Sequence, residues 1–225
     1  MLRAMVPGVR LVVLGMQGAG KGTQCGRLST HYVVPHISTG DMFRVAVKAN
    51  TEAGQVLAKY MEKGELVPDD VTTAVVKDRL LQPDAAERGF ILDGYPRTAP
   101  QAESLTQILS PEDVDLAIDL EIPRDAAVER LASRRVCGEC GTIYSSLTHP
   151  DGTPCDLCGG IVKQRGDDTK EAIARRIDLY QRDTEPLFDH YMRRKMLVTI
   201  DALGGEDEVF GRLVRAIDYR RGDKR

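Results

Sequence analysis

The sequence lacks three features that each mark a class of protein: a long apolar run, a large net charge and an abundance of aromatic residues. No apolar run approaches the roughly 20 residues of a membrane-spanning helix, and the N-terminal MLRAMVPGVR lacks the long apolar core of a secretory signal. The net charge is -3 and aromatic residues make up 5% of the chain, which argues against a basic, base-stacking surface for nucleic acid. We therefore expect a cytoplasmic protein that binds neither membranes nor nucleic acids.

The composition and patterning that are present are those of a globular α/β domain. Of the 225 residues, 42% are hydrophobic and 29% are charged, and the length suits one sizeable domain with an insertion. Short β-branched runs alternate with longer segments of helical spacing, which predicts a parallel sheet covered by helices. The expected strands cover residues 10–15, 90–93, 116–122 and 196–201. Val209, Leu213 and Ile217, four residues apart, predict a closing amphipathic helix.

A glycine-rich segment, GMQGAGKGTQ (15–24), follows the first expected strand. Its glycines allow backbone N–H groups to turn toward a phosphate, and the helix that follows adds the positive end of its dipole. Lys21 is in register to reach the β and γ phosphates of a nucleotide, although Gly22 stands where Ser or Thr is usual and Thr23 follows one place later. A plain glycine-rich turn is the alternative, and the flanking strand and helix disfavour it.

A second motif, ERGFILDGYPRTAPQ (87–101), contains the second expected strand. The strand ends at Asp93, which places a carboxylate beside the phosphate loop, where it can hold Mg²⁺ through water. Gly94 allows close approach of the backbone, and the planar guanidinium of Arg97 suits a second phosphate group. Alone, this motif is compatible with a simple turn after a strand.

Taken with four further motifs, these segments resemble the adenylate kinases with a long lid, a family of nucleoside monophosphate kinases. The further motifs are STGDMFR (38–44), GELVPD (64–69), RRVC (134–137) and RGDD with RRIDLYQRDTEPL (165–187). The resemblance covers nearly the whole chain, and it implies reversible phosphoryl transfer from MgATP to AMP to give two ADP, which maintains adenine nucleotide balance. It also implies a monomer. Gln17 replaces the proline usual before GAGKGT, but this change removes no phosphate donor because proline has no N–H.

The resemblance implies a three-layer α/β P-loop core with a parallel sheet and two mobile inserts. The core would comprise residues 1–37, 68–130 and 167–225. Residues 38–67 would form a monophosphate-binding flap, and residues 131–166 would form a lid that closes over bound nucleotide. Such a lid excludes water and carries arginines inward, as phosphoryl transfer requires.

The resemblance also implies a set of site residues. The catalytic residues would be Lys21, Asp93, Arg97, Arg130, Arg134, Arg165 and Arg176. ATP would be bound by Gly18, Ala19, Gly20, Lys21, Gly22, Thr23, Arg130, Ile143 and Tyr144. AMP would be bound by Thr39, Arg44, Glu65, Leu66, Val67, Gly94, Arg97, Gln101, Arg165 and Arg176. A solvated surface charge is the usual fate of a single arginine, but several arginines at motif positions make a coincidence improbable.

Four cysteines, Cys137, Cys140, Cys155 and Cys158, stand in a C-x2-C-x14-C-x2-C pattern. In a reducing compartment this pattern points to a metal before disulfides, and four thiolates suit tetrahedral Zn²⁺. The resemblance places the cluster in the lid and implies a structural zinc remote from the chemistry. His149 is a competing ligand by type. Cys25 is expected to be a small core residue, and the remaining histidines, His31, His36 and His190, belong to no motif.

Two other functions are compatible with parts of the sequence. A zinc ribbon that binds nucleic acid beside a P-loop ATPase is disfavoured by the acidic total charge and by the absence of Lys and Arg between the cysteine pairs. A UMP/CMP kinase is the closest rival among enzymes. That relative typically has Ala at the position of Thr39 and Asn at that of Thr98, so both residues favour AMP.

Overall fold

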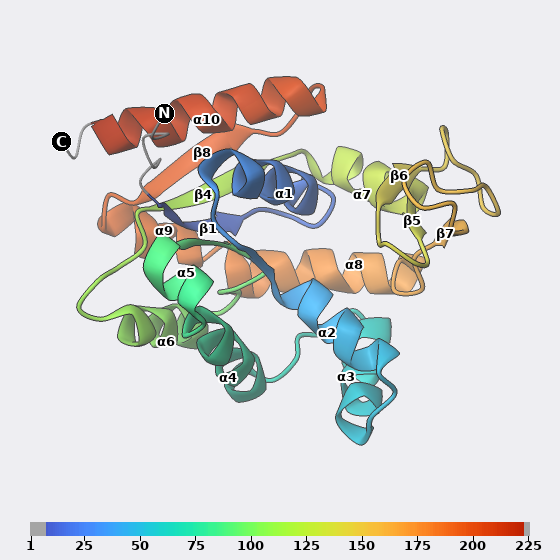
Figure 1. The fold of residues 1–225 in the computed structure, drawn as a ribbon, viewed down its shortest axis with the longest axis horizontal. Coiled ribbons are helices and arrows are strands. Elements are labelled where there is room, and N and C mark those ends of the chain that lie inside the picture. Colours follow the sequence, from blue (N-terminus) through green and yellow to red (C-terminus); the bar gives the residue numbers. More distant parts are fainter. Residues whose placement is uncertain (1–7, 223–225) are drawn as a thin grey trace.

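The computed structural model describes residues 8–222 and is built on a five-stranded parallel sheet (Figure 1). The strand order is β2 (His36–Ser38), β3 (Phe90–Asp93), β1 (Arg10–Leu14), β4 (Leu116–Glu121) and β8 (Leu197–Asp201). Every neighbouring pair is parallel, which confirms the predicted sheet. The four predicted strands are present, whereas β2 was missed because three residues are too few to show a pattern.

Helices cover both faces of the sheet, so the core has three layers, as predicted. On one face, side chains such as Leu11 and Val13 pack with α1 (Lys21–Tyr32), α7 (Arg124–Ser133), α8 (Lys170–Leu179) and α10 (Glu206–Gly222). On the other face, Val12 and Leu14 pack with α4 (Asp69–Leu80), α5 (Pro83–Arg88), α6 (Ala99–Leu109) and α9 (Leu187–Arg193). This alternation along β1 is what a strand buried on both faces requires. The predicted closing helix is α10, and its Val209, Leu213 and Ile217 are buried.

The segment 38–67 leaves the core as two helices, α2 (Thr39–Lys48) and α3 (Glu52–Glu62). The hydroxyls of Ser38 and Thr51 cap their N-termini. The two helices can pack closely because Gly54 has no side chain. A Cβ at this position would lie only 2.4 Å from the carbonyl oxygen of Ala46. This compact helical pair falls within the range expected for the monophosphate-binding insert, whose boundaries stay a prediction.

The cysteine-rich insertion forms a small sheet of its own, for which no strands were predicted. It contains a three-stranded antiparallel sheet, in which β5 (Arg134–Cys137) lies between β6 (Ile143–Ser145) and β7 (Val162–Gln164). No strand was predicted here because strands of three or four residues, separated by glycine-rich turns, show no clear alternation of apolar and polar residues. The limits 131–166 expected for the lid stay a prediction.

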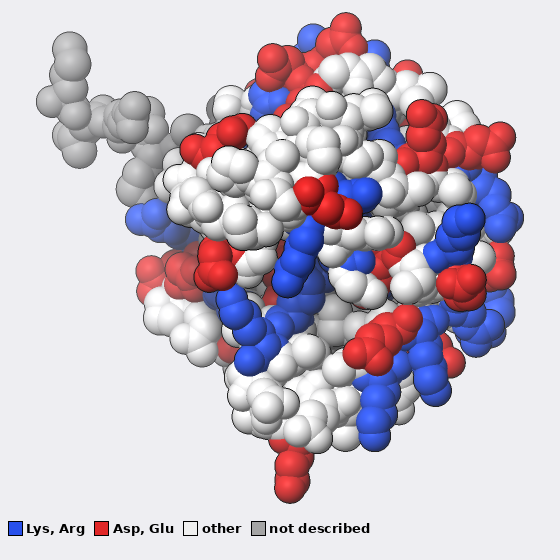
Figure 2. All heavy atoms as spheres, turned by 90° about the vertical axis from the view of Figure 1, so that its right-hand side faces the viewer, with Lys and Arg blue, Asp and Glu red and all other residues white. Residues whose placement is uncertain are grey.

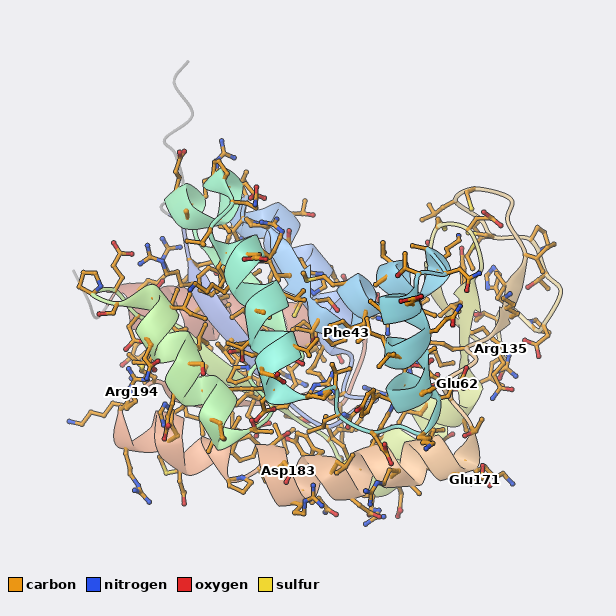
Figure 3. The ribbon with its side chains drawn as sticks, turned by 90° about the horizontal axis from the view of Figure 1, so that it is seen from below. Phe43, Glu62, Arg135, Glu171, Asp183 and Arg194 are labelled. Atoms are coloured by element: carbon orange, nitrogen blue, oxygen red, sulfur yellow. The ribbon has the colours of Figure 1, made fainter. Side chains whose placement is uncertain are left out.

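Helix α8 connects this small sheet to the core and continues into a π-helical turn, η1 (Tyr180–Thr184). Figure 3 shows α8 running along the lower side of the molecule, from Glu171 near its start to Asp183 in the turn. The Thr184 hydroxyl donates to the carbonyl of Arg97 at 3.0 Å, so the turn is tied to the second sequence motif. Among residues 8–222, no helix has both the length and the apolar content to cross a membrane.

Candidate active site

The glycine-rich segment forms a turn between the end of β1 and the start of α1. Gly18 and Gly20 have φ angles of 91° and 88°, a region that other residues rarely adopt. A Cβ at Gly18 would also lie 2.6 Å from the carbonyl oxygen of Ala127, so the turn packs directly on the start of α7. Gly20 is the N-cap of α1, and Lys21, Gly22 and Thr23 form its first turn. Free N–H groups at this helix end therefore face the carboxyl edge of the sheet.

Lys21 folds back onto the turn that precedes it. Its ammonium donates to the carbonyls of Gly15 at 2.6 Å and Met16 at 3.0 Å. Burial lowers the pKa of Lys21 to about 8, and the nearby Asp93 carboxylate opposes that shift. The buried cation is thus incompletely neutralised by its neighbours, so a phosphate at this position gains a strong charge-assisted contact.

Lys21 and Arg97, from separate motifs, line one small hollow at the surface. Its wall is completed by Gly15, Gln17, Gly94 and Thr184, among others. The Arg97 guanidinium is held there by a 2.8 Å bond from its Nε to the carbonyl of Gly94. Among the described residues, the buried side-chain oxygen of Gln17 has no hydrogen-bond partner. Two cations from separate elements thus line a single hollow, an arrangement that suits two phosphate groups.

Asp93 ends β3 beside this hollow, where its carboxylate has a neighbour that the sequence motifs did not indicate. The Nε2 of His36 lies 3.4 Å from Oδ2 of Asp93. Burial favours the neutral acid, but the bond to His36 and the charge of Lys21 outweigh it, so the pKa of Asp93 is lowered. A buried carboxylate that stays ionised fits the expected role of a Mg²⁺ ligand through water.

Three of the predicted arginines converge on two adjacent carboxylates, Asp167 and Asp168. Arg134 makes a bidentate pair with Asp168, with distances of 2.7 and 2.6 Å. Arg165 contacts Asp167 at 2.9 Å, and Arg176 contacts Asp167 at 2.5 Å and Asp168 at 3.1 Å. Both aspartates lie in the RGDD motif, but no role was predicted for them. We call these five side chains the arginine–aspartate cluster.

The charges of this cluster strongly affect one another. Burial favours the neutral form of Asp167, yet Arg165 and Arg176 lower its pKa to about 2. Burial and the neighbouring Arg134 lower the pKa of Arg165 to about 10. Three guanidinium groups face two carboxylates, so the cluster keeps an excess of positive charge. Such an excess attracts a polyanion.

Comparison with known proteins identifies the family of this site. The family model for adenylate kinase matches residues 13–196. The chain belongs to the adenylate kinase family. It is 48% identical to the adenylate kinase of Moorella thermoacetica over 86% of this chain and 90% of that protein. It is also 46% identical to a Clostridium perfringens adenylate kinase, covering 90% of this chain and 94% of that protein, and 45% identical to one from Streptomyces avermitilis, covering 96% and 100%.

The protein is therefore an ATP:AMP phosphotransferase, which converts ATP and AMP to two ADP. Adenylate kinases use Mg²⁺ together with ATP. This outcome confirms the activity predicted from the motifs and favours it over a UMP/CMP kinase or a nucleic-acid-binding ATPase.

The residues expected at AMP in this adenylate kinase lie on the side of β2 and β3. Thr39 is buried and donates to the carbonyl of Gly94 at 3.0 Å. The Gln101 side chain accepts from the N–H of Arg97 and donates to Asp69, both at 2.7 Å. Thr98 donates to the other oxygen of Asp69 at 2.7 Å. Asp69, which ends the GELVPD motif but was assigned no role, thus fixes the orientation of the Gln101 amide.

The remaining expected residues make contacts outside the hollow. Glu65, Leu66 and Val67 follow α3, and the Val67 carbonyl accepts from the Thr72 hydroxyl at 3.3 Å. Arg44 pairs with Asp41 on α2. Arg130 donates to the carbonyl of Ala202 at 3.2 Å, so its guanidinium is not part of the arginine–aspartate cluster in this state.

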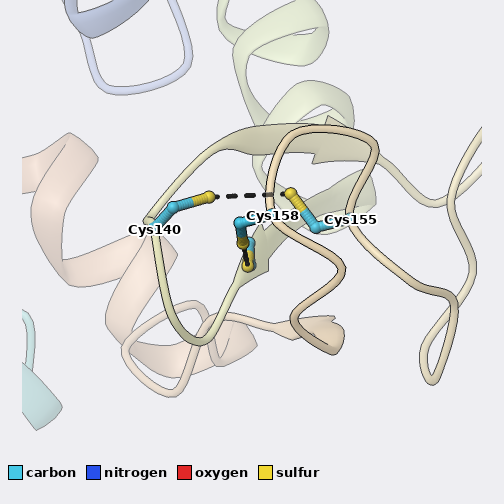
Figure 4. Close-up of side chains that lie close together, drawn as sticks. Cys140, Cys155 and Cys158 are labelled. Atoms are coloured by element: carbon cyan, nitrogen blue, oxygen red, sulfur yellow. Dashed lines mark hydrogen bonds between the residues drawn. The ribbon is translucent and has the colours of Figure 1, made fainter.

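The four cysteines of the insertion meet in one cluster (Figure 4). The Sγ atoms of Cys137 and Cys158 are 3.5 Å apart, and those of Cys140 and Cys155 are 3.6 Å apart. A zinc ion with Zn–S bonds of about 2.3 Å needs sulfur–sulfur distances of about 3.8 Å, so the thiols fit it with small shifts. No other described His, Asp or Glu joins the group. His149 instead pairs with Asp156 at 3.1 Å, which argues against it as a ligand.

Two residues expected at ATP, Ile143 and Tyr144, belong to β6 of this insertion. Ile143 is 47% exposed and is free to contact a ligand. The Tyr144 hydroxyl accepts from the N–H of Asp156 at 3.1 Å and lies 3.2 Å from Sγ of Cys155. Its one proton is therefore directed to the sulfur, which supports a thiolate at Cys155. The pKa of Cys155 is lowered accordingly to about 6, with this bond as the largest cause.

Proposed function

We propose that phosphoryl transfer between ATP and AMP takes place in the hollow between Lys21 and Arg97. The observation that carries this proposal is that one hollow is lined by a cation from each of the two motifs. ATP phosphates would lie on the turn at Gly18–Thr23 with Lys21, and the AMP phosphate would lie at Arg97 and Arg44. The two polyanions are then held in line, and no covalent protein nucleophile is required.

The protein groups at the site act by position and charge. Lys21, Arg97, Arg165 and Arg176 would contact phosphate oxygens, on which negative charge is spread during transfer. Asp93 would hold the hydration shell of the Mg²⁺ that accompanies ATP, and this ion supplies further charge neutralisation when bound. The arginines of the cluster would exchange their bonds to Asp167 and Asp168 for bonds to phosphate. Arg130, Arg134, Ile143 and Tyr144 would reach ATP as the lid closes.

Base recognition would rest on the residues around β2 and α6. Thr39 and the backbone at Glu65, Leu66 and Val67 would contact the adenine of AMP, and Gln101 would read its polar edge. The Gln101 amide is oriented by two 2.7 Å hydrogen bonds, so its remaining donor and acceptor positions are fixed in space. A fixed amide discriminates between bases because a mismatched partner leaves a buried polar group without a bond.

The cysteine cluster would hold a structural zinc ion, and the protein would act as a cytoplasmic monomer. Zinc fits because four thiols meet at suitable distances and close the coordination shell, which leaves no position for water or phosphate. We propose no binding to nucleic acid or membranes. On the face that Figure 2 shows, which is the lid side of Figure 1, basic and acidic side chains are interspersed. This mixture does not favour a polyanionic polymer.

Purified protein with MgATP and each of AMP, GMP, CMP and UMP tests this function, with diphosphate production as the measurement. AMP should be preferred by at least ~10-fold in kcat/KM, since one unmatched buried hydrogen-bonding group costs about 1–3 kcal/mol. Gln101→Ala should raise the KM for AMP and leave that for ATP unchanged. The control is Gln107→Ala, an exposed residue of the same helix. Equal or better rates with UMP or CMP contradict the assignment.

A further inference from the structure

Cys25, His36 and Asp93 meet beside the hollow, although they lie far apart in the sequence. One ligand atom from each of the three side chains lies within 4.8 Å of the other two. They come from α1, from the start of β2 and from the end of β3. Apart from the four lid cysteines, no other group of three possible metal ligands occurs among residues 8–222.

The register of the sheet explains why these side chains converge. His36 is paired with Ile91 in the parallel β2–β3 ladder, and Asp93 follows Ile91 by two residues. Paired residues and residues two apart point to the same face of a sheet, so His36, Ile91 and Asp93 share one face. Ile91 packs in the same core cluster as Cys25, which shows that this face is the one covered by α1. The thiol, the imidazole and the carboxylate are therefore held by rigid elements.

The three donors suit a borderline-soft divalent cation. Zn²⁺ binds sulfur, imidazole nitrogen and carboxylate oxygen, whereas Mg²⁺ takes oxygen ligands almost alone. With Zn–N and Zn–O bonds of about 2.0 Å, adjacent ligands of a tetrahedral ion lie about 3.3 Å apart. The observed distance between Nε2 of His36 and Oδ2 of Asp93 is 3.4 Å. We propose that Cys25, His36 and Asp93 form a second site for Zn²⁺ or Cd²⁺, and that an ion bound there inhibits the kinase.

Inhibition follows from the role of Asp93 and from the charges around it. An ion in this second site takes an oxygen of Asp93 as a direct ligand and withdraws it from the hydrated Mg²⁺ of ATP. It also adds two positive charges near Lys21, which lines the same hollow as Gly94, the residue after Asp93. The second site has three protein ligands, and the lid site has four thiolates. Zinc therefore fills the lid first and occupies the second site more weakly.

Metal binding can be measured without nucleotides and thus separately from the activity. Wild-type protein that already carries zinc in its lid is equilibrated with Zn²⁺, and the metal content is determined by elemental analysis. We expect two zinc ions per chain for the wild type and one for Cys25→Ala. Added Cd²⁺ should produce an ultraviolet thiolate band in the zinc-loaded wild type that is missing in Cys25→Ala. His36→Gln, which keeps a donor for Asp93 but has no imidazole, should also bind one zinc ion.

Kinase assays at constant MgATP then test the inhibition. Cys25→Ala should keep its basal activity, because Cys25 contacts no proposed substrate position. It should need at least ~10-fold more free zinc for half inhibition. Loss of a residue that only supports a metal ligand already lowers metal affinity by about 10–100-fold, and Cys25 is a direct ligand in this proposal. The lid variant Cys155→Ala is the control and should remain as sensitive as the wild type. One zinc ion per chain at saturation would overturn the site. Equal zinc sensitivity of wild type and Cys25→Ala would overturn the inhibitory role, whereas lack of any kinase activity would instead contradict the proposed function.

Discussion

Asp167 offers a sharp test of the arginine–aspartate cluster, because its replacement by Asn keeps the shape and removes the charge. Asp167 accepts from Arg165 at 2.9 Å and from Arg176 at 2.5 Å, and its side chain is only 10% exposed. In Asp167→Asn the two guanidinium groups stay buried with one counter-ion fewer. We therefore expect the variant to be less stable than the wild type near neutral pH.

The size of the loss follows from the pKa of Asp167. The pKa falls from 3.8 to about 2 in the folded protein, despite the opposing effect of burial, because Arg165 and Arg176 favour the carboxylate. Each pKa unit corresponds to about 1.4 kcal/mol, so the ionised Asp167 contributes about 2 kcal/mol to the free energy of unfolding. Since the folded pKa is the lower one, this contribution is present above about pH 4 and is lost as the pH falls toward 2.

Chemical denaturation followed by circular dichroism measures the effect. Asp167→Asn should lower the free energy of unfolding by about 2 kcal/mol or more near neutral pH, and the difference from wild type should shrink below about pH 4. Asp178→Asn is the control. Its exposed pair with Arg124, at 3.5 Å, should contribute less than about 1 kcal/mol.

The pH dependence is what distinguishes the ion pairs from packing. A difference between wild type and Asp167→Asn that stays constant from neutral pH to about pH 3 would refute the electrostatic explanation, since packing does not titrate. A variant as stable as the wild type at neutral pH would show that the cluster gives no net stabilisation. That result would agree with the general finding that desolvation of buried charges offsets much of their attraction.

Two further predictions concern the phosphate turn and the lid. Lys21→Met should keep the fold and lose at least ~10³-fold in kcat, because the lost charge faces the proposed position of the transferred group. The control is Lys59→Met, at an exposed position of α3, which should keep wild-type turnover. Near-normal turnover of folded Lys21→Met would show that the turn is not the phosphate site. Cys155→Ala should lose or weaken the lid zinc by elemental analysis, unfold at a lower temperature and retain substantial kinase activity when cold. Wild-type protein purified without chelator yet free of zinc would contradict a structural lid metal.

The lid prediction rests on how little apolar surface the insertion buries. Its hydrophobic cluster consists of Cys137, Cys155 and Val162, with Tyr144 packed against them. Full burial of one large apolar side chain contributes only about 1.5–3 kcal/mol, and fixing the backbone of each residue opposes folding by about 1–2 kcal/mol. Structural zinc sites contribute about 10–16 kcal/mol in small peptides. A bound zinc ion therefore stabilises this segment in one conformation more than its small apolar cluster does.

Local sequence patterns predicted those parts of the fold and site that are encoded locally. Four strands appear as apolar runs, and the turn before Lys21 appears as a glycine pattern with a lysine in register. The strand β2 was missed because its three residues show no pattern of their own and are ordered by pairing with β3. His36 was missed for the same reason, since its contact with Asp93 exists only through that pairing.

Long-range partners account for the other gaps in prediction. Asp168 lies in the RGDD motif, but its bidentate partner, Arg134, lies 34 residues before it in the sequence. Asp69 acquires a role only by meeting Thr98 and Gln101 across the fold. A sequence motif thus indicates the residues that are expected to contact a ligand. The residues that hold those side chains in position become apparent only where separate elements pack together.

Helix α8 physically connects the two sides of the site. The Arg176 guanidinium donates to the carbonyl of Met61, on α3, at 3.4 Å while it also binds Asp167 and Asp168. A Cβ at Gly64 would lie 2.5 Å from the carbonyl oxygen of Ala172, so the segment after α3 rests directly on the backbone of α8. If residues 38–67 form the mobile insert that we propose, their movement toward AMP must break these contacts or carry Arg176 with it. Either way, binding on the AMP side would change the surroundings of Arg176, for which we propose a contact with the transferred phosphoryl group.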